Sequence, residues 1–240
     1  SQSCILASRQ YHAIALNEHS LKPTQHAALL DAIATHQNTS VSSISHHIHF
    51  SPHDPTRAHT TAGVGFITQH NTNIVPLKPT TPAFQKAFDH GRAQLAFFHY
   101  NHNSFFIIVN IYCYTGSHSN PNATAKTDRL LTIVLEELKH QPTCPTFITM
   151  DLNADPQDIP TAKRMLQRLA WTDIGAIGSA FGALDSQPTC LAPNSSAPTR
   201  RDYMFANSLA LPLVVAFRVV PIDELPVHSL LQLQIRAKPH

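Results

Sequence analysis

The chain has 240 residues, of which 42% are hydrophobic, which is enough for one large α/β domain with a sizeable core. Its 18 prolines and 7 glycines follow no three-residue repeat, which excludes a collagen-like chain and argues against a disordered low-complexity one. Only 13% of the residues are charged and the net charge is +2, so the charge balance alone indicates no polyanionic partner.

The spacing of the cysteines and the length of the apolar stretches indicate the cellular compartment. Cys4, Cys113, Cys144 and Cys190 are far apart and form no zinc-binding spacing, so we expect isolated buried thiols. The longest apolar stretches fall well short of the roughly 20 residues that span a bilayer. Residues 1–10 lack the basic and apolar regions of a secretory signal. The sequence therefore predicts a soluble intracellular protein, with the nucleus among the alternatives.

Periodicity predicts an alternation of strands and helices along the chain, with no internal repeat. We expect four helices. One ends within residues 3–9, the second begins at Pro23, the third covers residues 122–140, and the fourth begins at Pro160. We expect strands at 12–16, 41–50, 63–68, 95–99, 105–112, 146–150, 203–206, 213–219 and 230–235, the fourth and fifth as an antiparallel hairpin. Long strands with few helices between them favour a two-sheet sandwich covered by helices over a doubly wound parallel sheet.

Polar side chains follow several apolar strands, where loops build sites on a rigid scaffold. They are Glu18, Asp151, Asn153, Asp202 and His228. Carboxylates with an amide suit a hard cation such as Mg²⁺, and a histidine held by a carboxylate can transfer protons near neutral pH. A single acid at a strand end is usually a solvated turn or cap, so the inference depends on the order and context of the whole set.

Five short segments carry that order: ALNEH at 15–19, NIYCYT at 110–115, MDLN at 150–153, RRDYMF at 200–205 with Thr189 before it, and VHS at 227–229. Their order resembles the endonuclease/exonuclease/phosphatase superfamily, which includes abasic-site endonucleases, DNase I-like nucleases and endonucleases of non-LTR retrotransposons. The resemblance covers nearly the whole chain. It implies a single domain over residues 1–240, a four-layer αββα sandwich of two mixed sheets between helices.

The resemblance also implies roles for individual side chains. Glu18 would bind Mg²⁺ or Mn²⁺, Tyr112 and Asn153 would hold the phosphate, Asp151 would orient or activate the attacking water, and Asp202 would position the catalytic His228. The implied activity is metal-dependent hydrolysis of a phosphodiester. A DNA endonuclease of retrotransposon type fits best, with a reverse transcriptase domain elsewhere in the full-length polyprotein.

Three features depart from the family pattern. Only seventeen residues precede Glu18, so we expect the family's first strand to be absent and the domain to be incomplete at its N-terminal end. Val227 stands where the family has an aspartate before the histidine, and Met150 stands where it has a glycine beside a tight turn. A degenerate, inactive copy is therefore one alternative. A phosphomonoesterase on the same scaffold is another, because one sequence does not assign the loops that bind the substrate.

Other groups of residues support weaker hypotheses. His47 and His49 would share one strand face, as a transition-metal pair or as part of a His-rich chain. Arg200 and Arg201 would contact phosphates or serve a structural role, and Trp171 is most simply a core residue. The chain has neither a Gly-rich phosphate loop nor a GxSxG segment, which disfavours a serine hydrolase.

Overall fold

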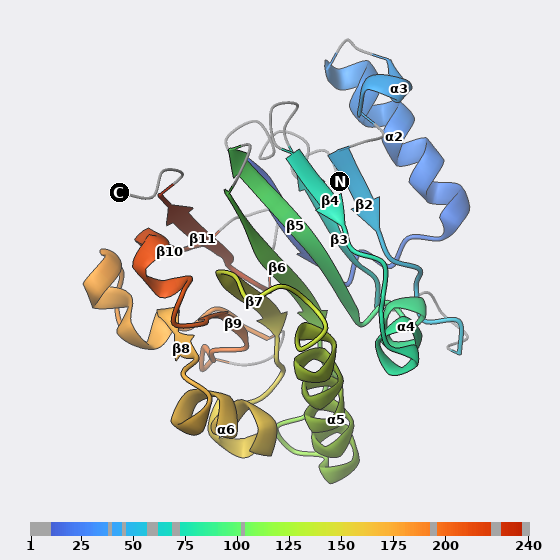
Figure 1. Ribbon diagram of the computed structural model, residues 1–240. Helices are drawn as coiled ribbons and strands as arrows, with labels where there is room; N and C mark the ends of the chain where they lie inside the picture. The colour runs from blue at the N-terminus through green and yellow to red at the C-terminus, as the bar shows by residue number, and fades with distance from the viewer. Residues whose placement is uncertain are drawn as a thin grey trace. The chain divides into compact units, whose positions relative to one another are not determined.

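A computed structural model describes residues 11–37, 40–44, 47–56, 62–68, 73–101, 104–192, 196–221 and 227–236 (Figure 1). The helix end expected at 3–9, together with Cys4, lies outside these ranges. The chain divides into two compact units. Unit 1 comprises residues 1–104 and 109–112, and unit 2 comprises residues 105–108 and 113–240. None of the helices in the described ranges has the length and apolar character that crossing a membrane requires.

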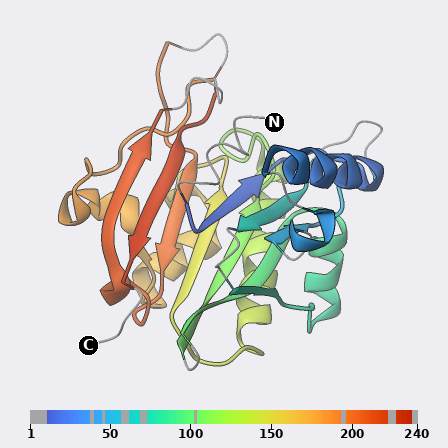
Figure 2. The same ribbon diagram turned by 90° about the horizontal axis from the view of Figure 1, so that it is seen from above.

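Within its described residues, unit 1 has a three-stranded antiparallel sheet, a pair of strands and three helices. Its elements are β1 (Ala13–Asn17), α2 (Pro23–Gln37), α3 (Val41–Ile44), β2 (Ile48–Phe50), β3 (Val64–Thr68), β4 (Asn73–Pro76), α4 (Pro82–Asp89) and β5 (Ala93–Asn101). The three-stranded sheet has the order β1-β3-β2, and β3 is buried along its whole length. On α2, buried Ile33 and Ala34 pack with Ile48 of β2, so this helix lies over the sheet (Figure 2).

One glycine of the central strand is required by close packing. Gly65 lies opposite both Leu16 and Phe50 in the antiparallel register. A Cβ atom at this position would lie 2.2 Å from Cδ1 of the Phe50 ring, a distance that side chains do not tolerate. The absence of a side chain at Gly65 therefore allows the Phe50 ring to lie against β3.

The strand predicted over 41–50 is wrong in its first half. Val41–Ile44 forms the short helix α3, and only Ile48–Phe50 extends as β2. Val41 and Ile44 are three residues apart, which places both on one side of a helical turn. The prediction also missed β4 and α4, although α4 begins with a recognisable signal. Thr81 caps this helix by accepting a hydrogen bond from the Phe84 backbone N–H at 3.2 Å, and a proline follows it.

The largest sheet has six strands in the order β4-β5-β6-β7-β9-β8, and β6 contributes residues to both units. The remaining elements are β6 (Ser104–Tyr112), α5 (Pro121–Leu138), β7 (Thr146–Asp151), η2 (Pro156–Asp158), α6 (Pro160–Arg168), β8 (Thr172–Asp173), η3 (Ile174–Phe181), β9 (Asp202–Ala206), η4 (Leu211–Leu213), β10 (Val214–Val220) and β11 (Leu230–Ile235). The prediction identified all of these strands except the two-residue β8. The α/β class that the sequence predicts is confirmed.

Unit 2 has its helices where the sequence signals place them. Asn120 caps α5 by accepting hydrogen bonds from the backbone N–H groups of Asn122 and Ala123. Proline opens both α5 and α6, and these two helices contact each other (Figure 1). The strands β10 and β11 form a separate antiparallel pair.

Two further predictions on single residues have outcomes in the fold. Cys113, Cys144 and Cys190 are buried, as expected, and form no disulfide within the described part of the chain. Trp171 is only half-buried and does not belong to the core, so that prediction is wrong. It follows α6, which ends at Arg168.

Candidate active site

Three of the predicted site residues lie together in unit 2. Asp151 ends β7 and Asp202 begins β9, and the two residues are directly opposite each other in the antiparallel pairing of these strands. His228 reaches the same place from the segment before β11, whose backbone forms a bridge with Cys190. One ligand atom from each of Asp151, Asp202 and His228 lies within 4.8 Å of the other two. The fold thus brings together two carboxylates and an imidazole from residues that span 77 positions of the sequence.

The imidazole of His228 is held by a carboxylate that is itself fixed. Nδ1 of His228 lies 2.9 Å from Oδ2 of Asp202. The same Oδ2 accepts a hydrogen bond from the Thr189 hydroxyl at 2.8 Å. The Thr189 hydroxyl in turn accepts hydrogen bonds from the backbone N–H groups of Arg201 and Asp202, both at 3.0 Å. Thr189 is 1% exposed, so this one hydroxyl sets the orientation of the Asp202 carboxylate.

We expect Thr189→Val to reduce the rate of the reaction catalysed at this candidate site about 10-fold or more, while Thr189→Ser retains that rate. Valine fills the same volume but removes the hydroxyl, which leaves Asp202 with one buried partner fewer. Single-turnover kinetics would measure the chemical step separately from substrate binding. Equal turnover in the valine and serine variants would show that the Thr189 hydroxyl does not position Asp202.

Asp151 lies in a different electrostatic environment, because it is 6% exposed. Burial, with the negative charge of Asp202 as the second cause, raises the pKa of Asp151 from its ordinary value of 3.8 to about 7. His228 and the amide groups of Asn153 act in the opposite direction. A carboxyl group with a pKa near neutrality can accept a proton at physiological pH, which suits a residue that activates water.

Two buried polar atoms at this place fit a bound cation and phosphate. Oδ1 of Asp151 and Nδ2 of Asn153 are buried and make no hydrogen bond of normal geometry. Buried polar atoms without partners are costly, by about 1–3 kcal/mol each. A divalent cation would neutralise the first and a phosphate oxygen would accept from the second. The donor set of carboxylates with an imidazole is one that such cations use.

The turn beside Asp151 occurs at a different residue from the one that the sequence suggested. Met150 lies inside β7, opposite Tyr203, and is buried in regular strand geometry. The left-handed residue is Asn153, with φ 56°, and asparagine tolerates this conformation better than most residues. Met150 therefore does not disturb a tight turn, and this departure from the family pattern carries no argument against activity.

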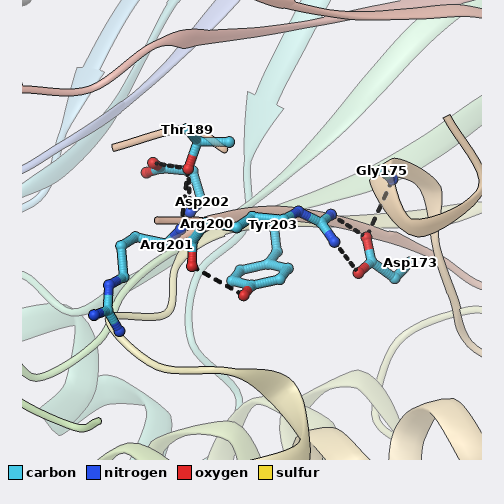
Figure 3. A network of polar contacts seen from close by, with 7 residues as sticks. All are labelled: Asp173, Gly175, Thr189, Arg200, Arg201, Asp202 and Tyr203. Atoms are coloured by element: carbon cyan, nitrogen blue, oxygen red, sulfur yellow. Dashed lines mark hydrogen bonds and ion pairs between the residues drawn. The ribbon is translucent and has the colours of Figure 1, made fainter. Parts of the chain in front are cut away.

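The two arginines before Asp202 have structural contacts (Figure 3). Arg200 makes two hydrogen bonds with the carboxylate of Asp173, at 2.8 and 2.5 Å, and its guanidinium lies 4.4 Å from the centre of the Tyr203 ring. The Tyr203 hydroxyl donates to the Arg200 carbonyl oxygen, and burial raises the pKa of this tyrosine. Arg201 donates to the carbonyl oxygen of Asn153 at 3.3 Å. Arg200 thus has the structural role that the sequence left open.

Glu18 and Tyr112 belong to unit 1. Glu18 follows β1 with φ 53° and is exposed. Tyr112 ends β6 and is buried, with the Arg92 guanidinium 5.0 Å from the centre of its ring. The roles that the resemblance implies for Glu18 and Tyr112 stay predictions. His47 lies 3.2 Å from the Thr68 hydroxyl and is in no group of three metal-ligating side chains among the described residues.

Comparison with known proteins identifies the fold. No family model and no curated protein matches the chain. Its structure is similar to a 3′-5′ exonuclease (NExo) from Neisseria meningitidis, with a TM-score of 0.69 and 14% identity over 98% of this chain and 93% of that one. A second structure of NExo is described as a 3′ phosphatase bound to a product DNA hairpin.

Two further structures extend the comparison. An AP endonuclease from Archaeoglobus fulgidus has a TM-score of 0.65 and 13% identity over 96% of this chain and 91% of that one. The endonuclease domain of TRAS1, a telomere-specific non-LTR retrotransposon, has a TM-score of 0.54 and 14% identity over 87% of this chain and 91% of that one. At these identities the likeness concerns the fold alone. The chain has the endonuclease/exonuclease/phosphatase fold, which is the DNase I-like fold that its sequence segments resemble.

Proposed function

We propose that this chain is a metal-dependent phosphodiester hydrolase that acts on DNA. The observation that carries the proposal is the cluster of Asp151, Asp202 and His228 at adjacent strand ends. The names of its structural neighbours support it, because they include a 3′-5′ exonuclease, an AP endonuclease and a complex with a DNA hairpin. The unpartnered atoms of Asp151 and Asn153 add two groups that a cation and a phosphate would satisfy.

In this proposal each side chain has a distinct task. A divalent cation, for which Glu18 is the predicted ligand, would supply positive charge that polarises the phosphate. Asp151 orients the attacking water and accepts its proton, and Asn153 donates a hydrogen bond from Nδ2 to a phosphate oxygen. His228, held by Asp202 through Nδ1, gives a proton to the leaving oxygen or stabilises its developing charge. No covalent protein nucleophile is needed.

The finer proposal is an endonuclease of retrotransposon type. The RRDYMF segment at 200–205 and the likeness to the TRAS1 endonuclease domain support it. A domain of this type would be joined to a reverse transcriptase in the full-length protein.

Two alternatives are each favoured by one observation. Phosphomonoester hydrolysis is favoured by a neighbour that is described as a 3′ phosphatase. An inactive copy is favoured by Val227, which places no carboxylate before His228. The Val227 backbone carbonyl oxygen accepts a hydrogen bond from the Leu191 N–H at 2.9 Å, so the segment itself is in place.

Nicking of a supercoiled plasmid tests the proposal. We expect cleavage in Mg²⁺ or Mn²⁺ that stops in excess EDTA, because the charge on the phosphate is then not offset. His228→Gln should lower the rate by about 10²–10⁴-fold, the usual contribution of a general acid–base group. The matched control is His140→Gln, an exposed histidine after α5, which should cleave as the unchanged chain does.

A second substrate separates the alternatives. Release of phosphate from a DNA hairpin with a 3′-phosphate, without plasmid nicking, would favour the phosphomonoesterase. Cleavage that persists in EDTA would exclude the metal-dependent mechanism. Folded protein, verified by circular dichroism, that hydrolyses neither substrate would favour the inactive copy.

A further inference from the structure

The backbone of Arg201 is fixed at the candidate active site. Its N–H donates to the buried Thr189 hydroxyl at 3.0 Å, and its carbonyl oxygen accepts a hydrogen bond from the Leu152 N–H at 2.8 Å. Leu152 directly follows Asp151, and Asp202 directly follows Arg201. The backbone of Arg201 therefore lies between the ends of the two strands that carry the site carboxylates.

The side chain of Arg201 lies against the turn that contains Asn153. Its Nη1 donates to the Asn153 carbonyl oxygen at 3.3 Å, and its Nε donates to the Thr199 hydroxyl at 3.3 Å. Asn153 is also the residue whose Nδ2 donates to a phosphate oxygen in the proposed function. Because the carbonyl oxygen and the side chain of one residue are only a few bonds apart, the guanidinium lies beside a proposed phosphate contact.

The positive charge of Arg201 is not offset by an acidic side chain. None of the ion pairs among the described residues includes Arg201, and its two hydrogen-bond acceptors are neutral. Arg200 differs, because its guanidinium is paired with Asp173. Figure 3 shows that the side chain of Arg201 extends away from this pair. Arg201 is half-buried, so its charge is only partly hydrated.

The contacts that Arg201 makes do not by themselves require a charged side chain. A glutamine amide also donates to a carbonyl oxygen, and burying a charge without an anionic partner costs more than burying a neutral amide. A guanidinium has five N–H donors in a planar fork that matches the oxygens of a phosphate. A nearby cation also offsets the repulsion between a phosphate and the carboxylates of Asp151 and Asp202. The charge of Arg201 thus suits an anion that arrives with the substrate.

We propose that Arg201 binds a backbone phosphate of the DNA substrate beside the Asn153 amide. This contact rests on the proposed function, because a phosphodiester substrate is what brings a phosphate to this place. A phosphate contact positions the DNA strand without reading its bases, so Arg201 raises the affinity for DNA of any sequence. Arg200 does not take this role, because its charge is already offset by Asp173.

The salt dependence of DNA binding tests this role. Fluorescence anisotropy of a labelled duplex oligonucleotide, in EDTA to prevent cleavage, gives the Kd between roughly 50 and 200 mM salt. Arg201→Gln should weaken binding about 10-fold at the lowest salt concentration. It should also reduce the slope of log Kd against log salt by about 0.9, the value expected for the loss of one phosphate contact. Arg201→Lys keeps the charge and should keep the slope. In plasmid nicking with Mg²⁺, Arg201→Gln should raise KM more than it lowers kcat.

The matched control is Arg218→Gln on β10, which removes the charge of an exposed arginine in the same unit and should change neither Kd nor KM. A lower Tm for Arg201→Gln with an unchanged salt slope and KM would overturn the inference, because Arg201 would then only support the turn at Asn153. Equal Kd and KM in Arg201→Gln and Arg218→Gln would also overturn it. In both cases plasmid cleavage by the unchanged chain would leave the proposed function standing. An unchanged chain that neither binds nor cleaves DNA would overturn both.

Discussion

Replacing Asp151 by Asn should lower the rate of phosphodiester hydrolysis by about 10²–10⁴-fold, because asparagine cannot accept a proton from water. The same substitution should make the folded protein more stable at pH 8. Asp151 is buried next to Asp202 and has one oxygen without a partner, so its negative charge is stabilised less in the folded chain than in the unfolded one. In the proposed mechanism, Asp151 thus contributes to catalysis at the expense of stability.

The sign of the pH dependence follows from the direction of the shift. The pKa of Asp151 is raised from 3.8 to about 7, so the folded chain binds more protons than the unfolded chain between these two values. Stability therefore falls as the pH rises through this window and stays low above it. The amide of the Asp151→Asn variant is neutral at every pH, so the advantage of this variant should be small near pH 4 and reach a few kcal/mol above pH 7.

Thermal unfolding at pH 4.5 and pH 8, in EDTA to keep cations away, would measure this effect. For a chain of this length each kcal/mol corresponds to roughly 2–4 °C in Tm, so a gain of several degrees is expected at pH 8. Added Mg²⁺ should raise the Tm of the unchanged protein more than that of the variant. An equal difference in Tm at both pH values would show that the Asp151 carboxyl is not destabilised by burial.

The largest effect on stability is expected for Arg200→Ala. Its guanidinium forms a two-point ion pair with Asp173, and the side chains are 13% and 7% exposed. Removal of one partner from a buried pair leaves the other charge uncompensated and typically costs about 3–5 kcal/mol. Within the described residues, the Asp173 carboxylate would keep only the hydrogen bond that it accepts from the Gly175 N–H. The contact of Arg200 with the Tyr203 ring would also be lost.

Urea unfolding of the variant should therefore show a midpoint far below that of the unchanged protein, with a Tm lower by about 10 °C. Arg218→Ala on β10 is a matched control, because Arg218 is exposed and such changes stay within about 0.5 kcal/mol. Arg200→Met combined with Asp173→Asn should recover part of the loss, since no unpaired charge remains. A loss below about 1 kcal/mol for Arg200→Ala would mean that solvent compensates Asp173.

How well each feature could be predicted depends on how locally the sequence encodes it. The strand at 146–151 is buried at every position, and its run of strand-favouring residues, TFITM, is visible without knowledge of its neighbours. In the segment 41–50, apolar and polar residues alternate only over 48–50, whereas Val41 and Ile44 are three residues apart, and the first four residues form a helix. The β4 strand is only four residues long, which is too short for a periodic signal.

The candidate site shows the same division. Asp151, Asp202 and His228 were predictable because each stands beside an apolar strand, and the structure gathers them. The resemblance connects Thr189 with the segment of Asp202, but it does not show that the Thr189 hydroxyl bonds to this carboxylate. The pairing of Asp173 with Arg200 likewise spans 27 positions. The pKa of Asp151 depends on burial, which is a property of the folded chain.

The course of strand β6 limits how this chain can be divided. Residues 105–108 and 109–112 follow each other along that strand, yet they belong to different units. A cut before residue 105 takes residues 109–112 away from unit 1, and a cut after residue 112 takes residues 105–108 away from unit 2. No single cut yields both units whole. Any division of the chain into two separate polypeptides therefore deprives one unit of part of β6.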